Sequence, residues 1–207
     1  MKFTMYKNTP KIIAVIIAAI AITLSHGQKR NALTLGSLNV TPGKVGIGTV
    51  TPTALLDVNG DAKINGLTIG KGHNYILTNV AFGIDALKNN TSGSQNVAIG
   101  NSTLYSNTTG GGNFAIGALA LSNNTTGEYN VALGYNALKT NITGSYTVAI
   151  GTDALFNNTT GYNTAIGYNS MLSTTTGTAN VAIGYQSLKA NTFGEANVAI
   201  GYSSMQA

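Results

Sequence analysis

The chain has 207 residues and a formal net charge of +5, and only 8% of its residues are charged. Ordinary globular domains carry about 25% charged residues. Cysteine is absent, which excludes disulfides and cysteine-based zinc sites. Without residues 1–27 the net charge falls to +2, because three lysines lie in that leader. A clustered basic surface for nucleic-acid binding is therefore not expected.

Residues 1–27 have the layout of a secretory signal peptide. Lys2, Lys7 and Lys11 precede an apolar run over residues 12–24, and small residues follow before Gln28. The run is shorter than the roughly 20 residues that a membrane helix needs, although an uncleaved anchor is the alternative. We expect a mature chain from about Gln28 without a membrane span. It would be secreted or held at the cell surface, in association with the outer membrane.

Residues 28–79 differ in pattern from the repeats that begin at Val80, since they contain very short apolar runs interrupted by glycine. This pattern predicts short strands. A solenoid needs an atypical end, because a bare terminal coil exposes the edge of its strand. We therefore interpret residues 28–79 as an amino-terminal cap or adaptor.

Residues 80–207 repeat one phrase, most often Asn-Val-Ala-Ile-Gly, at intervals of 17 residues with a single interval of 16. The shorter interval lies between Gly151 and Gly167, and we place the missing residue just after Gly161. A fixed short period indicates one small unit stacked on copies of itself. The glycines that end the phrase are predicted turn residues: Gly83, Gly100, Gly117, Gly134, Gly151, Gly167, Gly184 and Gly201.

Within each unit, Val and Ile stand two residues apart, as Val97 and Ile99 do, which is the period of a strand. A leucine or methionine follows four residues after the glycine. The Asn-Thr-Thr-Gly stretch is typical of a turn, where Asn and Gly tolerate positive φ. Each coil is predicted to hold two short strands and two tight turns. The fold class is thus all-β, a β-solenoid or parallel β-roll of about seven to eight coils.

The residue between Val and Ile is alanine in every copy: Ala81, Ala98, Ala115, Ala132, Ala149, Ala165, Ala182 and Ala199. Alternation along a strand points this residue opposite to its large neighbours. Our first hypothesis is that a second chain packs against this alanine ladder, as across a trimer axis. The alternative is that alanine faces the narrow inside of the coil while Val and Ile face the partner. Both readings favour an oligomer.

The stretches Val45-Gly-Ile-Gly, Leu56-Asp-Val-Asn-Gly and Gly66-Leu-Thr-Ile-Gly resemble a segment of exported bacterial fibre proteins. Such proteins often carry a carboxy-terminal chaperone domain of the endosialidase type (peptidase S74), whose pattern these 207 residues do not show. The Asn-Val-Ala-Ile-Gly repeats resemble the head of trimeric autotransporter adhesins. This resemblance implies a parallel β-roll in which three chains pack side by side, and it makes a homotrimer the expected assembly.

Two repeated side chains are candidates for ligand contact. Tyrosines that follow the phrase-ending glycine form a candidate contact ladder, with a structural role covering the turn as the alternative: Tyr135, Tyr168, Tyr185 and Tyr202. Threonine pairs such as Thr108 and Thr109 suggest an ice-binding row, although their setting reads as a turn. Glycosylation patterns such as Asn107-Thr-Thr come with the repeat, and we interpret them as turn residues first.

Neither a nucleophile motif nor a metal-binding cluster is present in the sequence, so we expect a non-enzyme without cofactor or metal. We interpret the chain as an exported structural or adhesive fibre segment that acts through a repetitive surface. Its ligand would be a host surface, a matrix or a polysaccharide. The alternative is a monomeric β-solenoid that binds ice or polysaccharide.

Overall fold

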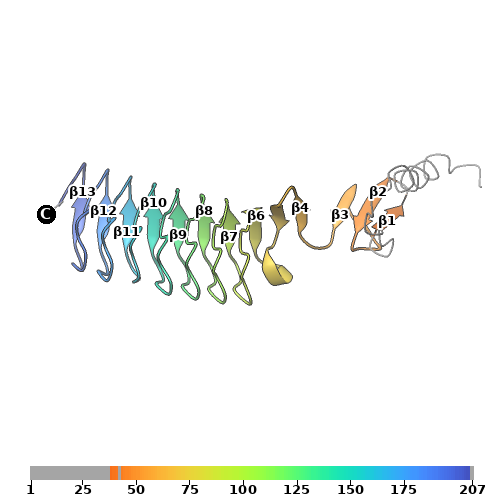
Figure 1. Cartoon of the computed structure of the whole chain (residues 1–207), viewed down its shortest axis with the longest axis horizontal. Coiled ribbons are helices and arrows are strands. Elements are labelled where there is room, and N and C mark those ends of the chain that lie inside the picture. Colours follow the sequence, from red (N-terminus) through yellow and green to blue (C-terminus); the bar gives the residue numbers. More distant parts are fainter. Residues whose placement is uncertain (1–37, 42, 206–207) are drawn as a thin grey trace, which may run out of the picture. The chain divides into compact units, whose positions relative to one another are not determined.

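The computed structural model describes residues 38–41 and 43–205, so the predicted signal peptide at residues 1–27 lies outside the described residues. The chain divides after Asp57 into two compact units. Figure 1 shows the strands of both units in chain order. The division falls inside the predicted adaptor, and residues 58–79 belong to the same unit as the repeats.

The first unit holds a small sheet in the order β1-β2-β3. Strands β1 (Leu38–Thr41) and β2 (Lys44–Ile47) form an antiparallel pair, and β3 (Leu56–Val58) lies on the other side of β2. The backbone N–H and the hydroxyl of Thr53 donate to one Asp57 carboxylate oxygen over 2.9 and 3.0 Å. These hydrogen bonds, the backbone one above all, lower the pKa of Asp57.

The second unit begins with an antiparallel hairpin of β4 (Ala62–Ile64) and β5 (Leu67–Gly70). A short 3₁₀ turn at His73–Tyr75 leads to β6 (Val80–Ile84), the first strand of the repeats. Strand β5 pairs antiparallel with β6. The hairpin therefore occupies the edge that the first coil would otherwise leave open.

Each following coil contributes one strand of three residues, and these strands lie parallel and in register (Figure 1). Alanine pairs with alanine at each step, as Ala132 does with Ala149. The strands are β7 (Val97–Ile99), β8 (Phe114–Ile116), β9 (Val131–Leu133), β10 (Val148–Ile150), β11 (Thr164–Ile166), β12 (Val181–Ile183) and β13 (Val198–Ile200). The predicted all-β solenoid of stacked coils is confirmed.

The prediction of two strands in each coil is wrong, because the half that follows the glycine consists of turns. Two residues of this half, for example Ser102 and Leu104, have φ of 53° and 51°. A left-handed residue reverses the direction of an extended chain, so two of them within three residues prevent a second strand. The turns still bond to the next coil, since the Leu104 N–H donates to the Ala120 carbonyl over 3.1 Å.

The interior of the coils is narrow and holds few large side chains. A leucine or methionine from each coil but the last, such as Leu104, is buried beside two small residues, often alanines such as Ala115 and Ala120; Met205 in the last coil is exposed. Asparagines complete the interior in two ladders. The first contains Asn79, Asn96, Asn113, Asn130, Asn163 and Asn180, and the second contains Asn90, Asn107, Asn124, Asn141 and Asn158; all of them are buried.

The shortened coil keeps the strand register, since Ala149 pairs with Ala165. The missing residue, however, is absent from the turn itself and not from the stretch after Gly161. The Asn158 Nδ2 donates to the Thr160 carbonyl two residues on, whereas Asn124 Nδ2 donates to Gly127 three residues on. Thr160 thus stands where the other coils have glycine. In the described chain, the Asn141 Oδ1 is left buried without a hydrogen-bond partner.

Candidate functional site

The predicted turn glycines all have positive φ, from 126° to 157°, which agrees with their expected role. They also allow close approach of the coils: a Cβ on Gly134 would lie 2.5 Å from the Gly151 carbonyl oxygen. The second glycine of the repeat behaves differently. Gly110 does not have positive φ, and its Cβ would collide with the Gly127 carbonyl of the next coil. The expectation that Asn-Thr-Thr-Gly uses glycine for its backbone freedom is therefore wrong.

The alanine ladder does not face a second surface, so our first hypothesis for it is wrong. Its eight members are at most 2% exposed and line the interior of the coils. The interior accepts only a small side chain here because the buried leucine and asparagines fill the remaining space. The alternative reading of the strand direction is correct: alanine points in, and Val and Ile point out.

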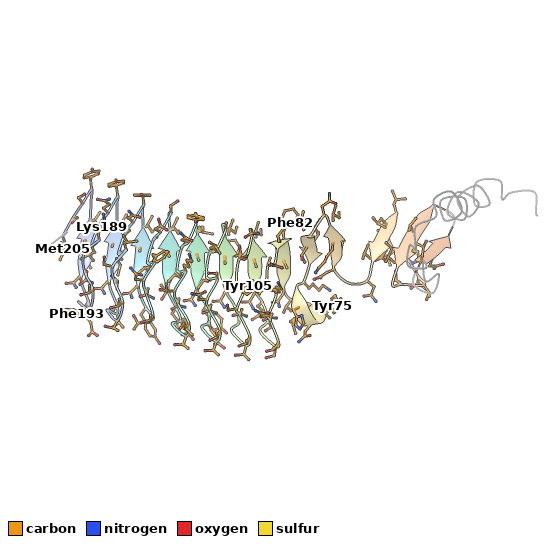
Figure 2. All side chains as sticks on the ribbon, in the orientation of Figure 1. Tyr75, Phe82, Tyr105, Lys189, Phe193 and Met205 are labelled. Carbon is orange, nitrogen blue, oxygen red and sulfur yellow. The ribbon has the colours of Figure 1, made fainter. Side chains whose placement is uncertain are left out.

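The outward side of strands β6 to β13 forms what we call the Val/Ile face. It consists of the first and third residues of each strand, in two columns: Val80, Val97, Phe114, Val131, Val148, Thr164, Val181 and Val198, and Phe82, Ile99, Ile116, Leu133, Ile150, Ile166, Ile183 and Ile200. All sixteen side chains are half-buried or exposed, with Phe114 at 41%. Neither column contains a charged residue. Phe82 lies in this face as the third residue of β6, whereas Phe193 lies at the looped end of its coil (Figure 2).

The predicted tyrosine ladder is only partly continuous. The rings of Tyr168 and Tyr185 stack at 5.3 Å between centroids, and those of Tyr185 and Tyr202 at 5.0 Å. Thr152 occupies the same place one coil before Tyr168 and separates Tyr135 from the others. All four tyrosines are exposed.

A second tyrosine ladder was not predicted from the sequence. Tyr129, Tyr146 and Tyr162 stack at 5.4 and 5.5 Å, with interplanar angles of 16° and 14°. Each of these tyrosines lies two residues before the first residue of a strand. The tyrosines of the predicted ladder lie two residues after the last residue of a strand. The sequence feature that could have revealed this ladder is a tyrosine at a constant distance before the strand in three coils. It was hidden because other coils have Gln95 and Ala179 at this place.

The threonine row carries little free hydrogen-bonding capacity. The Thr108 hydroxyl donates to the Thr125 carbonyl of the next coil over 3.0 Å, and Thr175 donates to Thr192 over 3.1 Å. These hydroxyls therefore serve the stacking of the coils. Asn107, the first residue of a glycosylation pattern, is fully buried, and its amide donates to Asn90 over 2.9 Å. The reading of this pattern as a structural turn agrees with that position.

Charged side chains lie away from the Val/Ile face. The Lys88 Nζ lies 3.2 Å from Asp85 and 5.3 Å from the centre of the Tyr105 ring. Its hydrogen bond to Asp85 raises the pKa of Lys88. Asp61 accepts hydrogen bonds from the backbone N–H groups of Lys71 and Gly72, over 2.7 and 2.9 Å. Within the described ranges, His, Asp and Glu side chains form no group of three that could hold a metal ion.

Searches with family models, among curated proteins and among solved structures find no match to this chain. Among the described residues, no helix has the length and apolar character required to cross a membrane. The repeats themselves offer the Val/Ile face and the two tyrosine ladders as candidate surfaces for function.

Proposed function

We propose that this chain is a segment of an exported structural or adhesive fibre at the cell surface, built from three copies packed laterally. The observation that carries the proposal is the Val/Ile face. Soluble monomers rarely expose a continuous apolar surface larger than a few hundred Å². The Val/Ile face runs over eight strands without a charged residue, with Phe82 exposed to 45% at its beginning and Ile200 to 68% at its end.

A second copy of the chain suits this face better than an unrelated protein does. Stacked strands repeat at about 4.8 Å, so the ridges and grooves of the face repeat at that spacing. Another copy has the same spacing, and its side chains would interdigitate over the whole length of the face. Closed assemblies of identical chains have point-group symmetry. The resemblance of the repeats to the heads of trimeric autotransporter adhesins favours a threefold axis.

The composition of the coils supports the same proposal. Each coil but the last buries one leucine or methionine with small and amide side chains, as Leu138 is buried beside Ala132. Most of the larger strand side chains are left outside. Packing of another copy over these side chains would stabilise the assembly by roughly 25 cal/mol for each Å² of apolar surface removed from water.

Export is tested by producing the full-length chain in a bacterial host with its own leader. We expect the chain outside the cytoplasm, beginning at Gln28, and digested by protease added to intact cells. Mass spectrometry of the purified chain identifies its first residue. Retention in the cytoplasm with Met1 in place would contradict export.

The alternative, a monomeric solenoid that binds ice, has less support, because the hydroxyls of its threonine row bond to the next coil. A thermal-hysteresis measurement separates the two functions. We expect no depression of the freezing point beyond the colligative effect.

A further inference from the structure

The ladder of Tyr129, Tyr146 and Tyr162 is not required by the coil. Their side chains are 52%, 53% and 66% exposed. Their φ angles are 54°, 58° and 64°, a left-handed conformation that is unfavourable for a bulky residue. Other coils adopt the same left-handed conformation with Gln95 and Ala179. Three aromatic rings at such positions therefore point to a role outside the fold.

The faces of these rings are used within the ladder. Tyr146 lies between the rings of its two neighbours. The outer face of Tyr129 is covered by the preceding coil, where a Cβ on Gly112 would lie 2.6 Å from the Tyr129 ring. Flat stacking of a sugar ring is therefore blocked at Tyr129 and Tyr146, and only the outer face of Tyr162 is not covered by another ring of the ladder. The ladder presents ring edges and phenol hydroxyls, each able to donate and accept a hydrogen bond.

The spacing of the hydroxyls selects among polymers. Ring centres follow one another at 5.4 and 5.5 Å. An extended peptide presents side chains on one face about every 6.6 Å, so its side chains no longer match the positions of the tyrosine rings after two coils. Nucleic acids require basic groups, whereas the charge next to the ladder is the acidic Glu128. An extended β-1,4-linked glycan advances by one sugar over a distance close to this rung spacing. Alternate sugars are turned over, so each rung meets a hydroxyl-bearing sugar edge and every second rung meets the same edge.

We infer that the ladder of Tyr129, Tyr146 and Tyr162 binds a linear, uncharged β-1,4-linked glycan lying along the stacking axis. The inference rests on the proposed adhesive role, for which it names the class of ligand. Each tyrosine hydroxyl contacts one sugar.

The test is binding of the full-length chain, produced with its own leader, to chitin and to cellulose, with α-1,6-linked dextran as the negative control. The variant Tyr129→Phe/Tyr146→Phe/Tyr162→Phe keeps the stacked rings and removes three hydroxyls. Because each hydroxyl contributes a modest hydrogen bond, we expect the triple variant to bind about tenfold more weakly or worse. The control Tyr75→Phe, at an exposed tyrosine outside both ladders, should bind as the unaltered chain does.

Two results would overturn the inference: no binding to either β-1,4-linked glycan, or unchanged binding by the first triple variant. Should that variant fold poorly by circular dichroism, Tyr146→Gln replaces it, since Gln95 occupies the same place in another coil. The mass of the same samples separates this inference from the proposed function. An intact trimer that ignores both glycans contradicts the inference alone, and a monomer that binds them contradicts the trimer alone.

Discussion

The Nδ2 of Asn124 lies 2.8 Å from the Oδ1 of Asn107 in the preceding coil, and both side chains are fully buried. The same amide donates to the Gly127 carbonyl over 3.0 Å, and its Oδ1 accepts from Asn141 over 3.1 Å. From Asn90 to Asn141, each asparagine of the ladder thus bonds the turn of its own coil and at least one asparagine of a neighbouring coil. Buried amides that satisfy one another in this way fix the register of the stack.

Asn124→Ala should lower the free energy of unfolding by about 2–4 kcal/mol, because it removes two donated bonds and leaves buried partners unsatisfied. The adjacent Asn123 is exposed, so Asn123→Ala is the matched control and should change stability by less than about 0.5 kcal/mol. Urea unfolding followed by circular dichroism measures both. Equal effects of the two substitutions would show that the buried amide ladder is not the source of stability.

Gly110→Ala should prevent close stacking, because the new methyl group would meet the Asn107 Oδ1 at 2.6 Å and the backbone of the next coil. We expect a loss of at least about 3 kcal/mol, or a chain that does not fold. Gly111→Ala is the control. Its new Cβ would lie 3.1 Å from the Ser94 carbonyl oxygen, and another coil has Ser145 at this place. Its urea midpoint should change little; an equally large loss there would contradict the importance of close stacking at Gly110.

Insertion of a serine between Gly161 and Tyr162 should stabilise the chain. It restores the full repeat length, so that Gly161 takes the turn position that Thr160 now holds. The Asn158 side chain can then donate to the Asn141 Oδ1, which now lacks a partner. Satisfying one buried acceptor is expected to add about 1 kcal/mol. Hydrogen exchange gives a local readout, and amide protection should rise in β10 and β11 in particular. Reduced protection there would mean that the shortened turn is the better-packed form.

The repeat period predicted the solenoid because in-register stacking places equivalent residues over one another. It could not decide which side of the strand faces inward. Alternation of Ala132 with Val131 and Leu133 has the same period in either direction. The interior is filled by Leu138 and by amides. Stacking of asparagine over asparagine follows from the repeat, but their burial does not, and the asparagines of the Asn-Thr-Thr-Gly stretch are predicted only as turn residues. Their partners lie one coil away.

The predicted tyrosine ladder was visible in the sequence because its members directly follow the phrase-ending glycine. The ladder at Tyr129 was missed since its positions hold Gln, Gly or Ala elsewhere. Its left-handed backbone also arises only from the path of the coil, which side-chain periodicity does not report.

The central claim is that the Val/Ile face packs against copies of the same chain. Light scattering of the full-length chain, purified as the bacterial host processes it, tests this most directly. We predict a mass of three chains. Val148→Lys should give single chains, because its charge would be buried between copies but remain at the surface of a monomer. Thr126→Lys, at an exposed turn, should remain trimeric. A folded, stable monomer of the unaltered chain would contradict the claim.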